Sequence, residues 1–186
     1  HFAPHNPDYI NLTSNSEYNP ELSKQLIKEA GYDKNNAITL KLPPPSYARR
    51  GGEIVASQLR SVGLNVKISN LEWAQWLEQV FKGKDYNLTI VSHTEPADIN
   101  IYARPNYYFQ YDSKKFQEVM RELNETTDPK ERSEILKKAQ TMISEDYVNG
   151  YLFQLAKTGV ANAKINGLWK NSPTQANDLT GVSWSD

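Results

Sequence analysis

Two strand patterns separated by a helix pattern limit the folds that this chain can adopt. Residues 38–42 and 64–68 alternate apolar and polar side chains, and residues 47–62 between them have helical spacing. A second helical pattern over 71–81 and an apolar run over 86–91 repeat the arrangement. Strand–helix–strand units of about 30 residues pair their strands in parallel, with a right-handed crossover. The sequence therefore predicts an α/β fold.

The same spacing predicts which side chains face the core. In the first strand Leu40 and Leu42 are expected to point inward and Lys41 outward, as in a half-buried strand. Gly51 and Gly52 are expected to weaken the first turns of the helix that follows. The larger apolar residues of that helix share one face, and we expect them to be buried: Ile54, Val55, Leu59 and Val62.

Further elements have recognisable boundaries. Residues 19–31 begin with Asn-Pro-Glu, which supplies a cap, a proline and an acid, and they end with glycine, as a helix does. Residues 128–145 begin with Asp-Pro in the same way, and residues 113–123 form a shorter helix pattern. The apolar run over 150–155 predicts a fourth strand.

We expect these elements to form one lobe. Residues 1–18 are polar and lack periodicity, so they predict an irregular N-terminal segment. Residues 19–165 are expected to form the α/β lobe, with a mixed sheet flanked by helices, and residues 166–186 an irregular tail. The chain begins at His1 without a signal peptide, which leads us to expect a processed chain or a fragment of a longer protein.

Charge and composition exclude several classes of function. With 21 Lys and Arg against 22 Asp and Glu, the net charge of -1 argues against a nucleic-acid partner, which needs a basic surface. The absence of cysteine excludes disulfides, zinc–thiolate sites, iron–sulfur clusters and thiol nucleophiles. No Gly-rich nucleotide loop or catalytic serine motif is present, so we expect no cofactor.

The candidate site begins where the third strand pattern ends. His93 follows that strand, with Thr94, Glu95 and Asp98 in the same loop. Ligands bind at the carboxyl ends of strands in open α/β sheets, so these side chains are candidate ligand contacts. The alternative is a loop histidine that is hydrogen-bonded among solvated acids.

An aromatic segment follows directly. Five of the ten residues over 102–111 are aromatic, and Arg104 lies among them. Tyrosine-rich loops supply binding area at little entropic cost, so Tyr107 and Tyr108 are further candidate contacts, expected to be solvent-exposed at the rim of a cleft. The alternative is a loop that its rings attach to the core.

Two other functions are compatible with the same loop. Glu95 and Asp98 form a carboxylate pair that a carbohydrate-active hydrolase could use. His93 and Glu95 could instead hold a metal or a metal chelate.

Several motifs resemble one family of binding proteins. Residues 18–32 are similar to the Tyr-x-Pro-x-x-Ala-x-x-Leu-x-x-Ala-Gly-Tyr segment of bacterial extracellular solute-binding proteins of the oligopeptide, dipeptide and nickel class. Residues 54–64 resemble the family's next helix and strand, and residues 127–140 its Thr-Asp helix that ends in Ala-Gln. The resemblance extends from about residue 18 to 165 and corresponds to the C-terminal lobe only.

The resemblance implies a function as well as a fold. It implies a periplasmic-binding-protein type lobe that captures a peptide or peptide-like solute for an ABC importer, without catalysis. The implied partners are a small solute or short peptide, the missing N-terminal lobe of the same protein and the membrane permease. The implied location is the periplasm, or the cell exterior with a membrane tether in a Gram-positive source.

The loop after the third strand departs from the peptide-binding pattern. In peptide-binding members it reads Trp-x-x-Asp, with the acid on the peptide amine, but the aligned positions here are Pro96 or Ser92. The nickel-type pattern Trp-x-x-Pro-x-Asp fits residues 93–98 better, with His93 in place of tryptophan. The resemblance leaves open a peptide held by Glu95 or another solute, such as a metal chelate or an opine-like compound.

Overall fold

The computed structural model describes most of the chain as two compact units. The first unit is His1–Tyr151 and the second is Leu152–Asp186. The residues that the structure describes are 1–93, 98–156, 158–170 and 178–185. The lobe boundaries expected from the sequence stay a prediction.

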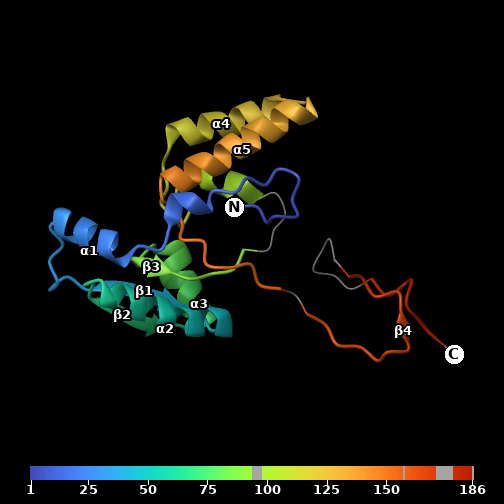
Figure 1. The fold of residues 1–186 in the computed structure, drawn as a ribbon, viewed down its shortest axis with the longest axis horizontal. Helices are drawn as coiled ribbons and strands as arrows, with labels where there is room; N and C mark the ends of the chain where they lie inside the picture. Colours follow the sequence, from blue (N-terminus) through green and yellow to red (C-terminus); the bar gives the residue numbers. More distant parts are fainter. Residues whose placement is uncertain (94–97, 157, 171–177, 186) are drawn as a thin grey trace. The chain divides into compact units, whose positions relative to one another are not determined.

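A parallel three-stranded sheet lies at the centre of the first unit. Strand β1 (Ile38–Leu42) is flanked by β2 (Val66–Asn70) and β3 (Leu88–Thr89), in the order β2-β1-β3 (Figure 1). Leu40 pairs with Ile68 of one neighbour, and both pairings are parallel. The predicted α/β class, with helices around the sheet, is confirmed, and β1 has the predicted bounds. The sheet was expected to be mixed, but in the described residues of the first unit it is wholly parallel.

Small residues bring the first crossover helix unusually close to the sheet. Helix α2 (Ser46–Ser61) buries only small side-chain positions, which are Ala48, Gly52 and Ala56. A Cβ atom at Gly52 would lie 2.3 Å from Cδ1 of Leu42, which is fully buried. Ile54 is 61% exposed, so the expected burial of the larger apolar face is wrong at this position. The close approach places small residues at the fully buried positions of α2, while Leu59 packs partly buried against the same core.

The opposite face of the sheet is also covered. Helix α3 (Trp73–Trp76) continues into a π-helical segment, η2 (Leu77–Lys82). Lys41 is only 8% exposed, and its Nζ donates to Gln79 Oε1 at 3.0 Å and to Asp85 Oδ2 at 2.7 Å. Because neighbouring strand residues face opposite sides, α2 and η2 sandwich β1. The expectation that Lys41 points into solvent is therefore wrong.

Two helices and a short 3-10 helix enclose a second core. They are α4 (Lys114–Glu125), α5 (Pro129–Glu145) and η3 (Asp98–Ala103), which lies in the loop after β3. Both helices have the predicted positions, and α4 packs against α5. The most deeply buried side chains of this core are Ile99, Ile101, Phe116, Ala139 and Ile143.

The first helix has the predicted N-cap, but none of its side chains is fully buried. Helix α1 (Pro20–Glu29) has Asn19 as its cap, and the Asn19 side chain accepts a hydrogen bond from the Leu22 amide. Leu22 and Leu26 are 46% and 53% exposed. Within the described ranges, no helix is long and apolar enough to cross a membrane.

Antiparallel pairing occurs only in a separate element of the described chain. Strands β4 (Ile165–Asn166) and β5 (Ser183–Trp184) form a two-stranded pair in the second unit. Residues 150–155 form no strand, so the predicted fourth strand is wrong. A strand needs a hydrogen-bonding neighbour, which an apolar run cannot supply by itself.

Replacing Asp128 by alanine is expected to lower the free energy of unfolding by about 1 kcal/mol, as loss of an N-cap does. Asp128 Oδ1 accepts hydrogen bonds from the amides of Lys130 and Glu131, both at 3.0 Å. Urea unfolding of the intact protein measures the change. Lys130→Ala, at an exposed position of the same turn, is the control and should change stability by less than about 0.5 kcal/mol.

Candidate functional site

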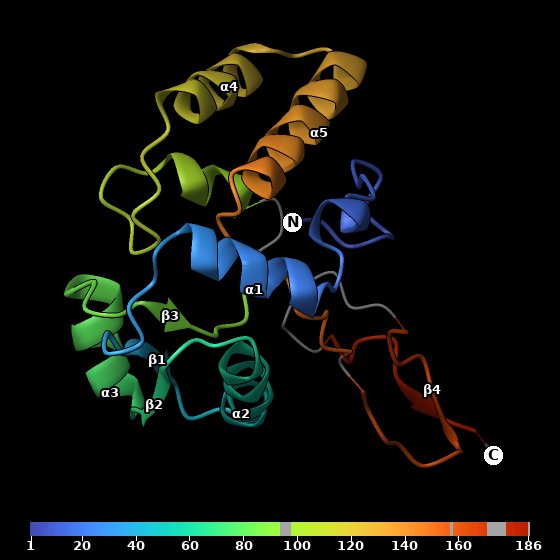
Figure 2. The same cartoon turned by 60° about the vertical axis from the view of Figure 1, so that its left-hand side comes forward.

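The candidate site lies beyond the carboxyl end of β3, in the first unit. Strand β3 is labelled in Figure 2; His93 follows it in the sequence, and Asp98 is the first residue of η3. Of the side chains predicted from the sequence, the structure describes His93, Asp98, Arg104, Tyr107 and Tyr108. Thr94 and Glu95 lie outside the described residues, and their roles stay predictions.

A buried carboxylate joins two histidines that are far apart in the sequence. The Asp98 side chain is 7% exposed, and its Oδ1 lies 2.7 Å from Nε2 of His1. Its Oδ2 lies 3.5 Å from Nδ1 of His93, which is an electrostatic contact rather than a good hydrogen bond. Oδ2 has no hydrogen-bond partner within the described residues. Asp98 therefore connects the N-terminal segment to the loop after β3.

The two histidines determine the charge of Asp98. Burial alone would raise the pKa of this carboxyl group, because it disfavours the charged form. The hydrogen bond with His1 and the contact with His93 outweigh burial and hold the pKa well below its ordinary value. Asp98 is thus ionised at neutral pH and can only accept hydrogen bonds.

A buried tyrosine lies behind His93. The Tyr108 hydroxyl is 2.8 Å from Nε2 of His93, and the two rings are nearly parallel, with 6° between their planes. Tyr108 is only 2% exposed, so its expected place at a solvent-exposed rim is wrong. Burial raises the pKa of the Tyr108 hydroxyl, which therefore stays protonated. Its backbone carbonyl accepts a hydrogen bond of 2.6 Å from the Tyr86 hydroxyl.

A similar arrangement exists on the other side of Asp98. The Tyr102 hydroxyl lies 3.4 Å from Nδ1 of His1 and also accepts a hydrogen bond from the Asn149 side chain. Its hydroxyl is 3.3 Å from that of Tyr151. Sequence reasoning did not select His1 or Tyr102 as site residues, because about a hundred residues separate them and no local motif links them.

The remaining predicted residues form a neighbouring aromatic surface. The Arg104 guanidinium lies over the Tyr107 ring, 5.4 Å from its centroid. Tyr107 is half-buried and its ring contacts those of Tyr108 and Phe109. Tyr107 thus connects Arg104 to the residue behind His93, and the rings attach this part of the loop to the core.

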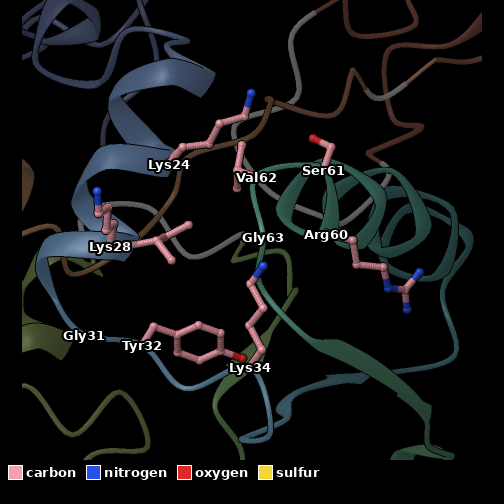
Figure 3. A pocket seen from close by; sticks show the side chains of 10 residues that line it. Lys24, Lys28, Gly31, Tyr32, Lys34, Arg60, Ser61, Val62 and Gly63 are labelled. Carbon is pink, nitrogen blue, oxygen red and sulfur yellow. The ribbon is translucent and has the colours of Figure 1, made fainter.

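A separate hollow lies between α1 and the end of α2. It has a volume of about 540 Å³ and is lined by four cations, Lys24, Lys28, Lys34 and Arg60 (Figure 3). Two of them are engaged: Lys24 pairs with Glu21, and Arg60 Nε donates to a backbone carbonyl of β2. Because both helices end here, their carbonyl ends favour cations, and the charges need no ligand to explain them. The hollow contains none of the predicted site residues.

Metal ligands do not gather in the described residues. No group of three or more His, Asp or Glu side chains in that part of the chain could hold a metal ion. Both nitrogens of His93 already face protein groups, so His93 has no free ligand atom. The metal alternative also required Glu95, which lies outside the described residues.

A polar cluster beyond the carboxyl edge of a parallel α/β sheet occupies the position at which open α/β sheets bind ligands. The family model for bacterial extracellular solute-binding proteins, family 5 (middle region), matches residues 1–114. The chain belongs to this family. The matched region includes the sheet, His1, His93, Asp98 and Tyr108.

Curated relatives are binding proteins of bacteria. The chain is 27% identical over 143 residues to the dipeptide-binding protein of Escherichia coli K12, a match that covers 69% of this chain and 27% of that protein. It is 24% identical over 178 residues to di/tripeptide-binding protein 4 of Pseudomonas aeruginosa UCBPP-PA14, covering 83% and 33%. The chain thus spans about a third or less of the length of these relatives.

Solved structures show the same fold. The dipeptide-binding protein of Pseudoalteromonas sp. SM9913, in complex with Met-Leu, superposes with a TM-score of 0.65 at 22% identity and covers 90% of this chain and 36% of that one. A periplasmic binding protein of Helicobacter pylori, in complex with the peptide STSA, superposes with a TM-score of 0.66 at 22% identity, covering 79% and 31%.

Proposed function

We propose that this protein captures a peptide or peptide-like solute for an ABC importer and that the chain forms part of one lobe of a two-lobed binding protein. The observation that carries the proposal is the family match over residues 1–114, which includes the whole cluster around Asp98. The named relatives are dipeptide- and di/tripeptide-binding proteins, which supports a peptide-like solute.

The cluster suits binding better than catalysis. A glycosidase needs a carboxylic acid whose pKa is raised, so that it can protonate the leaving group. Asp98 is unsuited to be that acid, because its neighbours hold its pKa below the ordinary value, and Glu95 lies outside the described residues. The family is one of solute-binding proteins, and we therefore do not retain the hydrolase alternative.

The proposed function implies partners and a location. The remainder of a longer protein would supply the other lobe, and the membrane permease of the importer would receive the solute. The relatives include periplasmic binding proteins, which supports a periplasmic or extracellular, membrane-tethered location. The net charge of -1 supports the absence of a nucleic-acid partner.

A solute panel tests the proposal on the intact protein. Di- and tripeptides including Met-Leu, an opine, a glycoside and Ni²⁺ are added separately, and the melting temperature is measured, because a ligand that binds the native state raises it. We expect at least one peptide or peptide-like compound to raise the melting temperature and remain chemically unchanged. Hydrolysis of the glycoside, or stabilisation by Ni²⁺ alone, would contradict the proposal.

Replacing His93 by alanine is expected to weaken solute binding about tenfold, which is about 1.4 kcal/mol. The His93 side chain is 30% exposed, and its loss also removes the hydrogen-bond partner of the Tyr108 hydroxyl and the contact of Asp98 Oδ2. Calorimetry on the intact protein measures the change. The matched control is His5→Ala, at an exposed position in the N-terminal segment, and equal affinities of the two variants would exclude His93 from the site.

A further inference from the structure

The ring of His93 is held from both sides. Asp98 lies at its Nδ1 atom, at 3.5 Å, and the Tyr108 hydroxyl lies at its Nε2 atom, at 2.8 Å. Both neighbours are more than nine-tenths buried, whereas the His93 side chain is 30% exposed. His93 is therefore the member of this buried polar group that solvent or a solute can reach.

The chemistry of the two neighbours fixes the direction of each contact. An ionised Asp98 can only accept a hydrogen bond. The proton of a neutral His93 therefore belongs on Nδ1, the nitrogen that faces Asp98. The protonated Tyr108 hydroxyl can then donate to the lone pair on Nε2. The opposite tautomer would place a lone pair against the carboxylate and leave Oδ2 of Asp98 with no proton to face.

The same pattern is repeated at the second histidine. His1 Nε2 lies 2.7 Å from Oδ1 of Asp98, so its proton belongs on Nε2, and the Tyr102 hydroxyl can donate to Nδ1. Burial raises the pKa of Tyr102, which keeps its hydroxyl neutral. The five residues thus form one continuous series, Tyr108–His93–Asp98–His1–Tyr102.

We propose that Asp98 and Tyr108 are positioning residues: they fix the ring orientation and the Nδ1-H tautomer of His93, so that a solute meets the imidazole through its face or carbon edge and not through a free nitrogen. This rests on the proposed function for its ligand. It specifies the part of the solute that fits against His93, which is a planar or apolar group such as a peptide plane or an aromatic ring. Anions and metal ions, which need a free nitrogen or its proton, do not fit.

The tautomer is measured directly by nitrogen NMR on the intact protein labelled with ¹⁵N at histidine, with the His93 signals assigned from a His93→Gln variant. In the neutral form of each ring we expect the signals of His93 to show the Nδ1-H tautomer, and those of His1 the Nε2-H tautomer. An Nε2-H tautomer at His93 would overturn the proposal. This readout needs no solute, so it can fail or succeed independently of the proposed function.

Tyr108→Phe removes only the hydroxyl and keeps the buried ring. In this variant we expect the His93 signals to move toward a mixture of tautomers and the affinity for Met-Leu to fall roughly three- to tenfold. The matched control is Tyr111→Phe in the same aromatic segment, whose hydroxyl donates to Asp146 at 2.5 Å and not to a histidine. An unchanged His93 tautomer in Tyr108→Phe would overturn the proposal, as would an equal change in the control.

Nickel supplies a second probe. Because both nitrogens of His93 face protein groups, we expect equimolar Ni²⁺ to leave its signals unchanged. Selective broadening of the His93 signals by Ni²⁺ would show a free nitrogen and would contradict the proposed arrangement.

Discussion

Replacing Gly52 by alanine is expected to lower the free energy of unfolding by about 2 kcal/mol, as overpacking of a closed core does. The added methyl group would lie 2.3 Å and 2.9 Å from the two terminal carbons of Leu42. Leu42 belongs to β1 and is fully buried against α2, so it cannot turn away without displacing its neighbours. Urea unfolding of the intact protein measures the change.

The adjacent glycine provides the control. A Cβ atom at Gly51 would have no atom within 4 Å, and both glycines lie in the same helix. Gly51→Ala should therefore raise stability by about 0.5–1 kcal/mol, because alanine loses less backbone entropy on forming a helix. Opposite signs for the two substitutions would confirm the close approach of α2 to the sheet. Stabilisation by both would show that the helix lies further from β1.

Replacing Asp98 by asparagine is expected to cost about 3 kcal/mol of stability at neutral pH, as loss of hydrogen bonds to a buried charged group does. Asparagine keeps the size of the side chain but can present only one acceptor to two histidines that both point protons at it. One histidine must then change tautomer, so that its other nitrogen donates to its tyrosine instead of accepting from it, or keep an unpaired buried proton.

The effect of Asp98→Asn should depend on pH in a specific direction. The pKa of Asp98 is lowered in the folded protein, and the unfolded value is about 3.9. Its contribution to stability is present above the unfolded pKa and is lost as the pH falls toward the folded pKa. The difference between native and variant proteins should therefore be full at pH 5 and above and shrink below about pH 4. A difference that grows below pH 4 would contradict the arrangement.

The fold was predictable where local patterns determine it. The alternation in β1, the caps at Asn19 and Asp128 and the strand–helix–strand order all depend on neighbours in the sequence. The burial of α2 was not predictable in this way, because it depends on how closely two elements approach. Large apolar residues indicate a core face only when the gap has room for them. Here only a glycine, Gly52, fits where α2 approaches Leu42, and Ile54 is exposed.

The site was predictable only in part. His93 and Asp98 were predicted as site residues because they follow a predicted strand. Tyr108 was predicted because it lies in a segment rich in aromatic residues. Neither signal shows that the Tyr108 hydroxyl lies behind His93, nor that His1 reaches Asp98 from the start of the chain. Contacts between distant segments depend on the packing of η3 and the N-terminal segment. The burial of Lys41 against Asp85 was missed for the same reason.

Hydrogen exchange of the intact protein, with and without the tightest-binding solute of the panel, tests the central claim most directly. The claim is that a solute is held beyond the carboxyl end of β3, around His93. We predict slower exchange on solute binding in peptides that span residues 88–110, with little change in α4, α5 or the hollow between α1 and α2. Protection confined to those other regions, with residues 88–110 unchanged, would contradict the account.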